Sequence, residues 1–368
     1  MRIRKDILEA DKIFNEASKN LTFSSINPTN INAAKRKFLN NSIKNPVLKY
    51  EIPNVNLLEL RRKVSSVNLD EKSILDTFMI EKQEDIIRKI DLINSVGCFD
   101  FTERSIKLYG LPNKILVDKA HEILNQKYVK EPEKKILSKD VVFALKKNLK
   151  EFNLNYKIIK EDIVSSCNLE ASQKKISLKK KSRFSELFIN RLIVHEIGTH
   201  AFRYENGKQH KLSIFANGFA NYLETEEGLA AYNEERFNLL GQSFLRNYAG
   251  RVLAVNYAQE FGFYKTFKKL NKFFDKKKAF QLSLRAKRGL SDTELAGGFT
   301  KDVVYLRGYY RVKNYIGKGG KLKDLYYGKI GIEDVELIKK LRLERPKIIP
   351  DKFLLFGQDK TIDEVRSQ

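Results

Sequence analysis

Two of the four histidines in this chain flank a glutamate, in the segment His195-Glu196-Ile197-Gly198-Thr199-His200. Imidazole nitrogens are common zinc ligands, and a glutamate beside such a ligand is suited to act as general base towards an activated water. Apolar residues at 192–194 precede the segment and indicate a buried helix. We therefore expect a hydrolytic zinc site with His195 and His200 as ligands and Glu196 as catalytic base.

The spacing of this motif is HExxxH, one residue longer than the common HExxH. In an ideal α-helix, residues four apart lie about 40° apart around the axis, whereas residues five apart diverge by roughly 140°. A π-type bulge would bring the two imidazoles back to one face, and Gly198 lies where the backbone would have to relax. The spacing predicts an irregular turn at residues 197–199.

A catalytic zinc site normally has three protein ligands, so one more ligand is required. The best candidates lie in the segment 224–232, where an acidic cluster opens an apolar helical run. Thr225 is placed to cap that helix, and the N-terminal end of a helix favours a carboxylate. Glu226 and Glu227 point in different directions, and their spacing does not choose between them.

The HEIGTH segment and the ETEEGLA segment at residues 224–230 together resemble a family of bacterial proteins named for a QEGLA motif, which includes the eukaryotic microtubule-associated tyrosine carboxypeptidases. Further similarity lies at residues 285–290, 298–306 and 327–330. The resemblance implies a zincin-like fold with one zinc ion. It also assigns Glu227 as the third ligand, because Glu226 occupies the position of the family's glutamine and adds a negative charge there.

The resemblance further implies a metallocarboxypeptidase that acts on the C-terminal tail of a peptide or protein. The basic character of the chain suits an acidic tail. Glu196 would take a proton from the attacking water and deliver it to the leaving amine. Tyr305 is our candidate donor to the developing oxyanion. A terminal carboxylate needs a cationic partner, and the candidates are Arg288, Lys301 and Arg307.

The chain carries 70 basic and 46 acidic residues, a formal net charge of +24. Such a field steers acidic partners, and nucleic acid is one of them. The sequence nevertheless contains no recognisable nucleic-acid-binding motif. The alternative function is a basic nucleic-acid or protein-binding module with a structural or vestigial metal site, but an intact Glu196 argues against it. Hydrolysis of a non-peptide amide is a third possibility.

The composition is that of a folded globular chain of 368 residues with 42% hydrophobic residues. Its two cysteines, Cys98 and Cys167, lack a CxxC spacing and suit a reducing compartment. No apolar segment has the length of a signal peptide or of a membrane span. We expect a cytoplasmic protein without a membrane partner.

The hydrophobic pattern predicts an α+β fold that is predominantly helical, with a small sheet packed beside the active-site helix. Residues 1–150 are interpreted as an N-terminal arm, to about residue 60, followed by a helical accessory region. Residues 151–368 are interpreted as the zincin-like catalytic domain. Strands are expected at 155–160 and 175–179, an active-site helix capped by Ser185, and helices at 226–237 and 253–274.

Three other features are interpreted as structural. His121 and His210 are expected to pack in the core. The glycine-rich segment 316–321 lacks the spacing of a phosphate-binding loop and is expected to be a surface turn. The lysines between 265 and 288 alternate with phenylalanines, which predicts a buried aromatic face and a solvated basic face.

Overall fold

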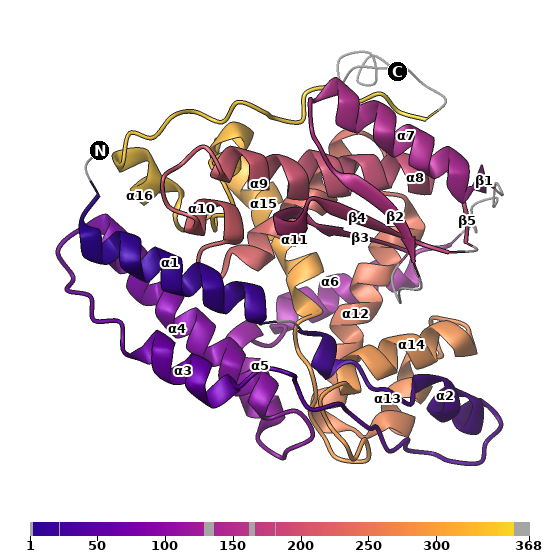
Figure 1. Cartoon of the computed structure of the whole chain (residues 1–368). Helices are drawn as coiled ribbons and strands as arrows, with labels where there is room; N and C mark the ends of the chain where they lie inside the picture. Colours follow the sequence, from indigo (N-terminus) through magenta and orange to yellow (C-terminus); the bar gives the residue numbers. More distant parts are fainter. Residues whose placement is uncertain (1–2, 22, 129–135, 162–165, 181, 357–368) are drawn as a thin grey trace. The chain divides into compact units, whose positions relative to one another are not determined.

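Most of the described chain is helical, and short strands form two small sheets (Figure 1). The computed structural model describes residues 3–21, 23–128, 136–161, 166–180 and 182–356. The predicted α+β class with a predominance of helix is confirmed. The chain divides into two compact units, each built from two segments: Met1–Tyr128 with Phe244–Arg307, and Val129–Ser243 with Gly308–Gln368. These bounds differ from the single division at residue 150 expected above.

The first unit begins with helices that pack along one another, α1 (Lys5–Asn20), α3 (Leu57–Ser65), α4 (Ile74–Asn94) and α5 (Phe101–Tyr109) (Figure 1). Ile7 and Phe14 of α1 are buried. Arg4, just before α1, donates a hydrogen bond of 2.6 Å to buried Asp76 at the start of α4. The first 20 residues therefore belong to the helical core of this unit and are not an arm, because their apolar stripe has a partner helix.

Residues 27–56 are the part of the N-terminal region that does run along the unit as a strap. Leu48 N donates to Ser291 O at 2.9 Å, and Tyr50 Oη donates to Leu290 O at 3.0 Å. The short α2 (Ile31–Leu39) inserts Phe38 among the aromatic residues of two later helices, with ring centroids 5.0 Å from Phe263. These contacts fix the strap through backbone pairing at one end and hydrophobic burial at the other.

The first unit also contains α6 (Lys114–Asn125), α12 (Gln242–Glu260), α13 (Phe263–Leu270) and α14 (Lys276–Lys287). α12 begins two residues before Phe244, where the second segment of this unit starts. The prediction of a single helix over 253–274 is wrong, because α12 ends at Glu260 and α13 begins only at Phe263. A Cβ on Gly262 would lie 2.4 Å from Glu294 O, so this position must turn closely past another backbone segment.

The predicted aromatic face is confirmed in part: Phe280 is buried, while Phe267, Phe273 and Phe274 are half-buried. The predicted solvated basic face is wrong at Lys287, which is buried and donates to the backbone carbonyls of Ala258 and Leu295.

The second unit contains a three-stranded sheet of order β2-β4-β3 and a two-stranded sheet of β1 and β5. β2 (Lys157–Glu161) pairs parallel to β4 (Lys175–Lys179), and β3 (Cys167–Glu170) pairs antiparallel to β4 on its other side. The strand predicted at 175–179 is confirmed, and that at 155–160 begins two residues later. β3 was not predicted. It lies against the helix that carries His195 and His200.

The remaining elements of this unit are mostly helical. Ser185 accepts a hydrogen bond from Phe188 N at 3.2 Å, which confirms the predicted N-cap of α8 (Glu186–Leu192). The glycine-rich segment forms the predicted turn after α15. The other elements are β1 (Ile136–Leu137), α7 (Ser138–Glu151), β5 (Arg183–Phe184), α9 (Phe202–Gly207), α10 (Ile214–Asn217), α11 (Tyr222–Arg236), α15 (Val303–Gly317, from residue 308 in this unit), η4 (Leu322–Tyr326) and α16 (Val335–Lys340).

The C-terminal segment crosses the second unit and is held by asparagine side chains from three helices, Asn148, Asn190 and Asn206, the last of which donates to Ile348 O at 2.7 Å. Asn148 donates to Leu354 O at 2.8 Å, and Asn190 donates to Phe356 O at 3.1 Å. The ring of Phe353 is buried against Phe202 and Phe237. Each asparagine satisfies a backbone group of an otherwise irregular segment, so the segment can lie in the core without losing hydrogen bonds.

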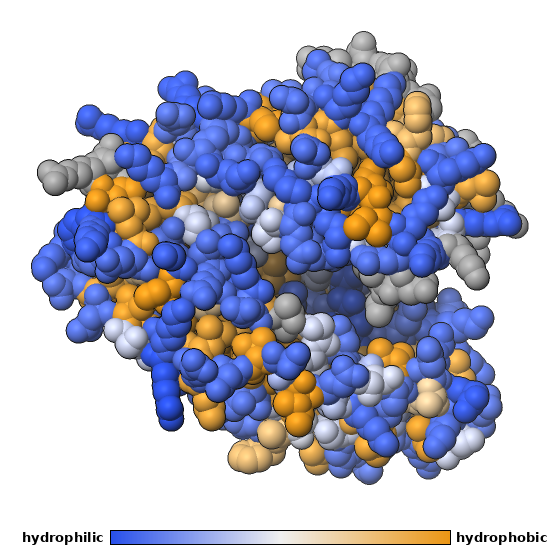
Figure 2. Space-filling model, in the orientation of Figure 1, coloured by the Kyte–Doolittle hydropathy of each residue, from blue (hydrophilic) through white to orange (hydrophobic). Residues whose placement is uncertain are grey.

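The face drawn in Figure 2 is mostly hydrophilic, and hydrophobic residues appear on it in separate small patches. This distribution agrees with a chain in which charged residues make up 32% of the sequence. Among the described helices, none is long and apolar enough to cross a membrane.

Candidate metal centre

The HEIGTH segment lies in a π-helix, η3, that covers Ile193–Ala201 between α8 and α9. Hydrogen bonds in a π-helix join residues that are five apart. Two side chains at this spacing, such as those of His195 and His200, therefore lie on about the same face of the helix. Thr199 Oγ1 reaches Val194 O, five residues earlier, at 3.4 Å. The predicted irregularity is therefore confirmed in kind, but it extends over nine residues and is not limited to residues 197–199.

The wider π-helix turn is supported by side chains from other elements. Tyr326 Oη donates a hydrogen bond of 2.8 Å to Gly198 O. Asn233 on α11 donates to Tyr326 Oη at 2.7 Å and to Thr199 Oγ1 at 2.9 Å. These buried groups form hydrogen bonds with polar atoms of η3. Because π-helices are rare, we infer that these hydrogen bonds help to stabilise this one.

Gly198 makes room for an aromatic ring. A Cβ at this position would lie 2.3 Å from Cζ of Phe353. Gly198 is not among the residues with positive φ, so it needs no conformation that other residues avoid. The expectation that Gly198 relaxes the backbone is therefore replaced by a packing explanation: the C-terminal segment can seat Phe353 only against a helix surface without a side chain.

The helix that carries the acidic cluster, α11, begins four residues earlier than predicted, at Tyr222. Asn221 precedes it in the left-handed region with φ 56°. Thr225 lies inside the helix, where its hydroxyl accepts a hydrogen bond from Ile332 N at 3.0 Å, so the prediction that Thr225 caps the helix is wrong. The acidic residues of the cluster thus lie in the first and second turns, on a helix that packs along η3.

The glycine of the EGLA segment has a packing role of its own. A Cβ on Gly228 would lie 2.1 Å from the carbonyl carbon of Gly308 on α15, and a Cβ on Gly308 would lie 2.1 Å from Glu224 O. The two backbones therefore touch at a pair of glycines. This close contact fixes the position of α11 at the residue next to Glu227.

The structure brings His195, His200 and Glu227 together. Each offers one ligand atom, and these atoms lie within 4.8 Å of one another. His195 Nε2 is 3.7 Å from Glu227 Oε2, and the two imidazole rings are nearly perpendicular, with centroids 4.9 Å apart. Within the described residues, this is the one group of three or more histidine, cysteine or acidic side chains so arranged.

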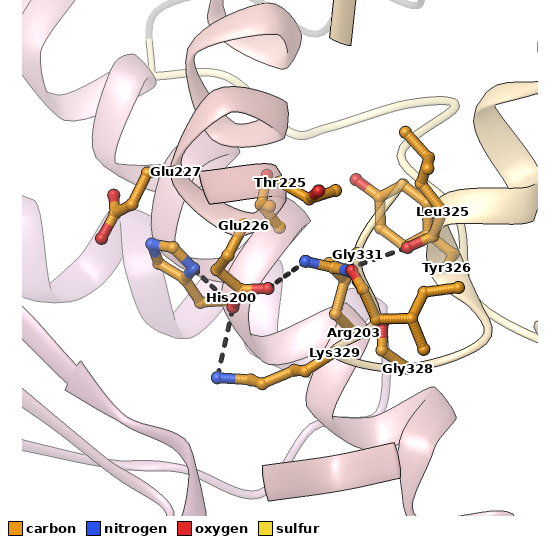
Figure 3. A network of polar contacts seen from close by, with 12 residues as sticks. His200, Arg203, Thr225, Glu226, Glu227, Leu325, Tyr326, Gly328, Lys329 and Gly331 are labelled. Carbon is orange, nitrogen blue, oxygen red and sulfur yellow. Dashed lines mark hydrogen bonds and ion pairs between the residues drawn. The ribbon is translucent and has the colours of Figure 1, made fainter. Parts of the chain in front are cut away.

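Each of the two imidazoles has a carboxylate partner of its own, in addition to Glu227. Glu234 Oε1 lies 2.6 Å from His195 Nδ1, and Glu226 Oε1 lies 2.9 Å from His200 Nδ1. When Nδ1–H donates to a carboxylate, Nε2 presents its lone pair to the opposite side. In Figure 3 one nitrogen of the His200 ring faces Glu226 and the other is turned towards Glu227. With the proton on Nδ1, Nε2 is the nitrogen that a metal ion would bind.

Glu226 is the centre of a buried charge network (Figure 3). Besides His200, its carboxylate accepts a hydrogen bond from the buried Arg203, and Lys329 Nζ lies 3.2 Å away. Burial alone would raise the pKa of Glu226, but Lys329, Arg203 and His200 hold it well below the usual range. Glu226 is therefore ionised, and the negative charge that it adds beside the site is balanced by two cations.

Arg203 and Glu234 are fixed by further contacts. Arg203 donates to the backbone carbonyls of Leu325, Gly328 and Ile330, at 2.9, 3.0 and 2.5 Å. Glu234 Oε2 accepts from Arg191 Nε at 2.8 Å. Burial would raise the pKa of Glu234, but Arg191 and His195 lower it. The groups that orient the imidazoles thus have ordered partners of their own.

Glu196 lies on η3 next to His195 and is about one-tenth exposed. Its carboxylate makes no hydrogen bond or ion pair to any residue that the structure describes. Burial, and then the charge of Glu196, raise the pKa of the Cys167 thiol on β3 well above the usual range. The Glu196 carboxylate is therefore close enough to Cys167 and to His200 to act on both electrostatically.

The donor set fits a zinc ion. Two imidazoles and one carboxylate are the ligands of a well-known class of catalytic zinc sites, which keep a further position for water. The ordered carboxylate partner on each imidazole is also typical of zinc ligands. Burial would lower the pKa of His200, but the charges of Glu226, Glu227 and Glu196 raise it, so the same carboxylates that raise this pKa would favour a bound cation.

The other predicted site residues all lie in the first unit. Arg307 donates to the backbone carbonyl of Tyr109 at 2.7 Å. Arg288 donates to Asn27 Oδ1 at 2.7 Å, and Lys301 Nζ lies 5.3 Å from the ring centroid of Phe23. Tyr305 is stacked with Tyr248. The structure therefore does not bring these four residues together with the metal donors inside one unit.

The two other histidines have the structural contacts expected of them. His121 Nε2 is 3.3 Å from Tyr257 Oη, and its ring packs near Phe273. His210 Nε2 lies 2.9 Å from Tyr327 O, and burial lowers the pKa of His210 below the usual value. Neither belongs to a group of metal donors among the described residues.

The sequence of the chain matches the family model described as microtubule-associated tyrosine carboxypeptidase over residues 36–358. The chain belongs to this family. The matched span includes His195, His200, Glu226 and Glu227, and it confirms the resemblance carried by the HEIGTH and EGLA segments.

Curated members of this family are similar at modest identity. The human putative tyrosine carboxypeptidase MATCAP2 is 31% identical over 170 residues, which cover 45% of this chain and 32% of that protein. The rat microtubule-associated tyrosine carboxypeptidase 1 is 31% identical over 188 residues, which cover 50% of this chain and 38% of that protein. The match thus spans about a third of the length of these family members.

Sequence reasoning did not find the residues that surround the proposed ligands, among them Glu234, Arg203 and Lys329. Glu234 follows Glu227 by seven residues, two helical turns on the same face of α11, so the helix period could have indicated it. Arg203 follows His200 by three residues in the same way. Lys329 lies in a segment noted only for similarity to the family, and no local pattern connects it to Glu226.

Proposed function

We propose that this chain is a zinc-dependent carboxypeptidase that hydrolyses a peptide bond near the C-terminus of a protein tail. The observation that carries the proposal is the convergence of His195, His200 and Glu227, with a carboxylate on Nδ1 of each imidazole. The names of the family members support carboxypeptidase action. A zincin-like arrangement of the catalytic unit is part of the proposal.

His195, His200 and Glu227 would hold the zinc ion. Once bound, zinc supplies Lewis acidity, which lowers the pKa of a water to about 7 and polarises the scissile carbonyl. Glu226 and Glu234 keep Nδ1 of each imidazole protonated, and therefore keep Nε2 free as a ligand. Arg203, Lys329 and Arg191 hold these two carboxylates in place.

Glu196 would act as the general base. It follows a proposed ligand directly in sequence, and its carboxylate has no competing hydrogen bond in the part of the chain that the structure describes. It would accept a proton from the attacking water and pass it to the nitrogen of the leaving amine. An uncommitted, largely buried carboxylate is suited to this role, because it need not break a contact first.

The edge strand β3 would align the peptide. Among the described strands, β3 has β4 on one side only, and it lies against η3. An extended peptide can add to such an edge through backbone hydrogen bonds. Tyr305 as oxyanion donor, and Arg288, Lys301 and Arg307 as partners of the terminal carboxylate, stay predictions from the sequence, because all four residues belong to the first unit.

The proposal is tested by incubating the chain, reconstituted with zinc, with a library of peptides that have free C-termini, and by reading the products by mass spectrometry. We expect shortening from the C-terminus by the parent chain and none by Glu196→Gln, which keeps the proposed ligands. Glu205→Gln is a matched control, since Glu205 lies on the next helix and contacts Tyr156 and Lys174. Equal trimming by parent and Glu196→Gln would overturn the assignment of the base.

A further inference from the structure

The first unit contains a second cluster of charged side chains, formed by α12, α14 and the start of α15. Lys278 and Arg285 lie on α14 seven residues apart, on one face of the helix, and Arg288 follows at its C-terminal end. Arg251 comes from α12. Asp302 lies just before α15. The four cations interact electrostatically with one another or with Asp302.

The cations of this cluster outnumber the carboxylates. Asp302 is buried and accepts two hydrogen bonds from Arg285, at 2.5 and 2.6 Å, so its two oxygens are used by one guanidinium. Asp275, the exposed N-cap of α14, is the other carboxylate that acts on Lys278. Even when both carboxylates are counted, an excess of two positive charges remains at a partly buried position.

Arg251 has donors without acceptors. Its Nε and Nη1 are buried and have no hydrogen-bond partner among the residues that the structure describes. The guanidinium lies over the ring of Tyr305, 4.2 Å from its centroid, and Tyr248 stacks on Tyr305 with centroids 5.6 Å apart. The aromatic pair fixes the plane of the guanidinium but cannot accept its in-plane N–H groups. Buried, unpaired donors on a charged group are costly, and most folded proteins avoid them.

The environment of the neighbouring cations is consistent with this imbalance. Burial, and then the charges of Arg251 and Arg285, lower the pKa of Lys278 to about 8. Burial and the charge of Arg285 lower the pKa of Arg288 to about 10. No described acidic residue forms an ion pair with Arg251, Lys278 or Arg288. A bound anion would relieve both the charge excess and the unpaired donors.

We propose that Arg251, with Lys278, Arg285 and Arg288 around it, forms a binding site for a carboxylate group of a peptide. The planar fork of a guanidinium matches the two oxygens of a carboxylate, and the Tyr305 ring holds this fork in a fixed orientation. The carboxylate could be the chain terminus of the peptide or an acidic side chain. The choice of a peptide as ligand rests on the proposed function; the anion site itself does not.

The test is a binding measurement on the Glu196→Gln chain, which leaves peptides intact. The probe is a fluorescent peptide rich in glutamate with a free C-terminal carboxylate, followed by anisotropy at low salt. We expect Arg251→Gln in this background to weaken binding at least tenfold. Lys278→Gln, at a half-buried position of the same cluster, should also weaken binding of the probe. This variant tests the proposal if Arg251→Gln fails to fold. Arg62→Gln removes one exposed guanidinium of the same unit and should change binding less than twofold.

Two further peptides identify the source of the carboxylate. A C-terminal amide tests the chain terminus, and glutamine in place of glutamate tests the side chains; we expect one of these two changes to weaken binding to the Glu196→Gln chain tenfold or more. The proposal is overturned if both peptides bind as tightly as the probe, or if Arg251→Gln and Lys278→Gln bind like Arg62→Gln. Absence of peptidase activity in the parent chain would affect the proposed function but not this binding result.

Discussion

Glu226 Oε1 lies 2.9 Å from Nδ1 of His200, and the same carboxylate accepts a hydrogen bond from the buried Arg203. Glu226 thus connects a proposed metal ligand to a cation in the core. Its neighbour Glu227 lies near the other ring nitrogen of His200 and is one of the proposed metal donors (Figure 3). Two adjacent glutamates therefore have different tasks, and each task can be removed separately.

Replacing Glu226 by glutamine, the residue of the family motif, should leave metal binding in place and lower stability. The amide oxygen can still accept from His200 Nδ1, but Arg203 and Lys329 lose their negative partner in the core. Removal of one member of a buried ion pair costs about 3–5 kcal/mol. Denaturant unfolding of the metal-free chains measures this cost. In Glu227→Gln, whose carboxylate has no such cations, the metal-free stability should change little; a larger loss there would contradict this division of roles.

Glu234→Gln should weaken zinc binding about 10–100-fold, because Glu234 fixes the tautomer of His195 and partners of this kind usually contribute that much. Competition with a chromogenic chelator gives the affinity. Glu235→Gln is the control, since the neighbouring Glu235 contacts Tyr309 and Lys313. If both variants bind zinc as the parent does, Glu234 does not orient the ligand.

Gly198→Ala should destabilise the chain by about 1–3 kcal/mol through overpacking against Phe353. A smaller residue at 353 makes space for the added methyl group, so Phe353→Leu combined with Gly198→Ala should cost less than the sum of the two single changes. A double-mutant cycle by thermal or denaturant unfolding measures this coupling. Strictly additive costs would indicate that Gly198 is required for another reason, such as the π-helix backbone.

The stability of the first unit should depend on pH through Lys82. This buried lysine lies 3.4 Å from Asp85, and burial, with the charge of Lys89, lowers its pKa from 10.5 to about 8. The unfolded chain therefore binds more protons between pH 8 and 10.5, so Lys82 makes the folded state more stable as pH rises through this range. Relative to Lys82→Met, the parent should gain up to about 3 kcal/mol, since one pKa unit corresponds to about 1.4 kcal/mol.

Unfolding free energies of both chains at pH 7.5 and pH 10 give this difference. Lys107→Met is the matched control: Lys107 is an exposed lysine of the same unit that pairs with Glu103, and its removal should leave the pH dependence assigned to Lys82 in place. A constant difference between parent and Lys82→Met across this range would show that Lys82 keeps an ordinary pKa in the folded chain.

Local patterns predicted those parts of the fold and the site that depend on neighbouring residues. The cap at Ser185, strand β4 and the irregular helix turn all follow from spacing within a few residues. Contacts between distant segments were not predictable in this way. Phe353 against Gly198 and Lys329 beside Glu226 join positions more than 100 residues apart, and nothing in either segment specifies its partner.

The composition of the two units illustrates the same limit. The sequence changes character near residue 150, and a division there was the simplest expectation. The compact units instead combine residues 1–128 with 244–307, and 129–243 with 308–368. α12 and α15 run continuously across the segment boundaries, so their hydrophobic patterns contain no signal of the change.

Metal content tests the central claim most directly. The parent chain and the variants His200→Ala, Glu227→Ala and Glu226→Gln would be loaded with zinc, desalted, and analysed by inductively coupled plasma mass spectrometry. We expect about one zinc per chain in the parent and in Glu226→Gln, and a large loss in His200→Ala and Glu227→Ala. A parent chain without zinc, or full zinc in Glu227→Ala, would contradict the assignment of His195, His200 and Glu227 as the metal site.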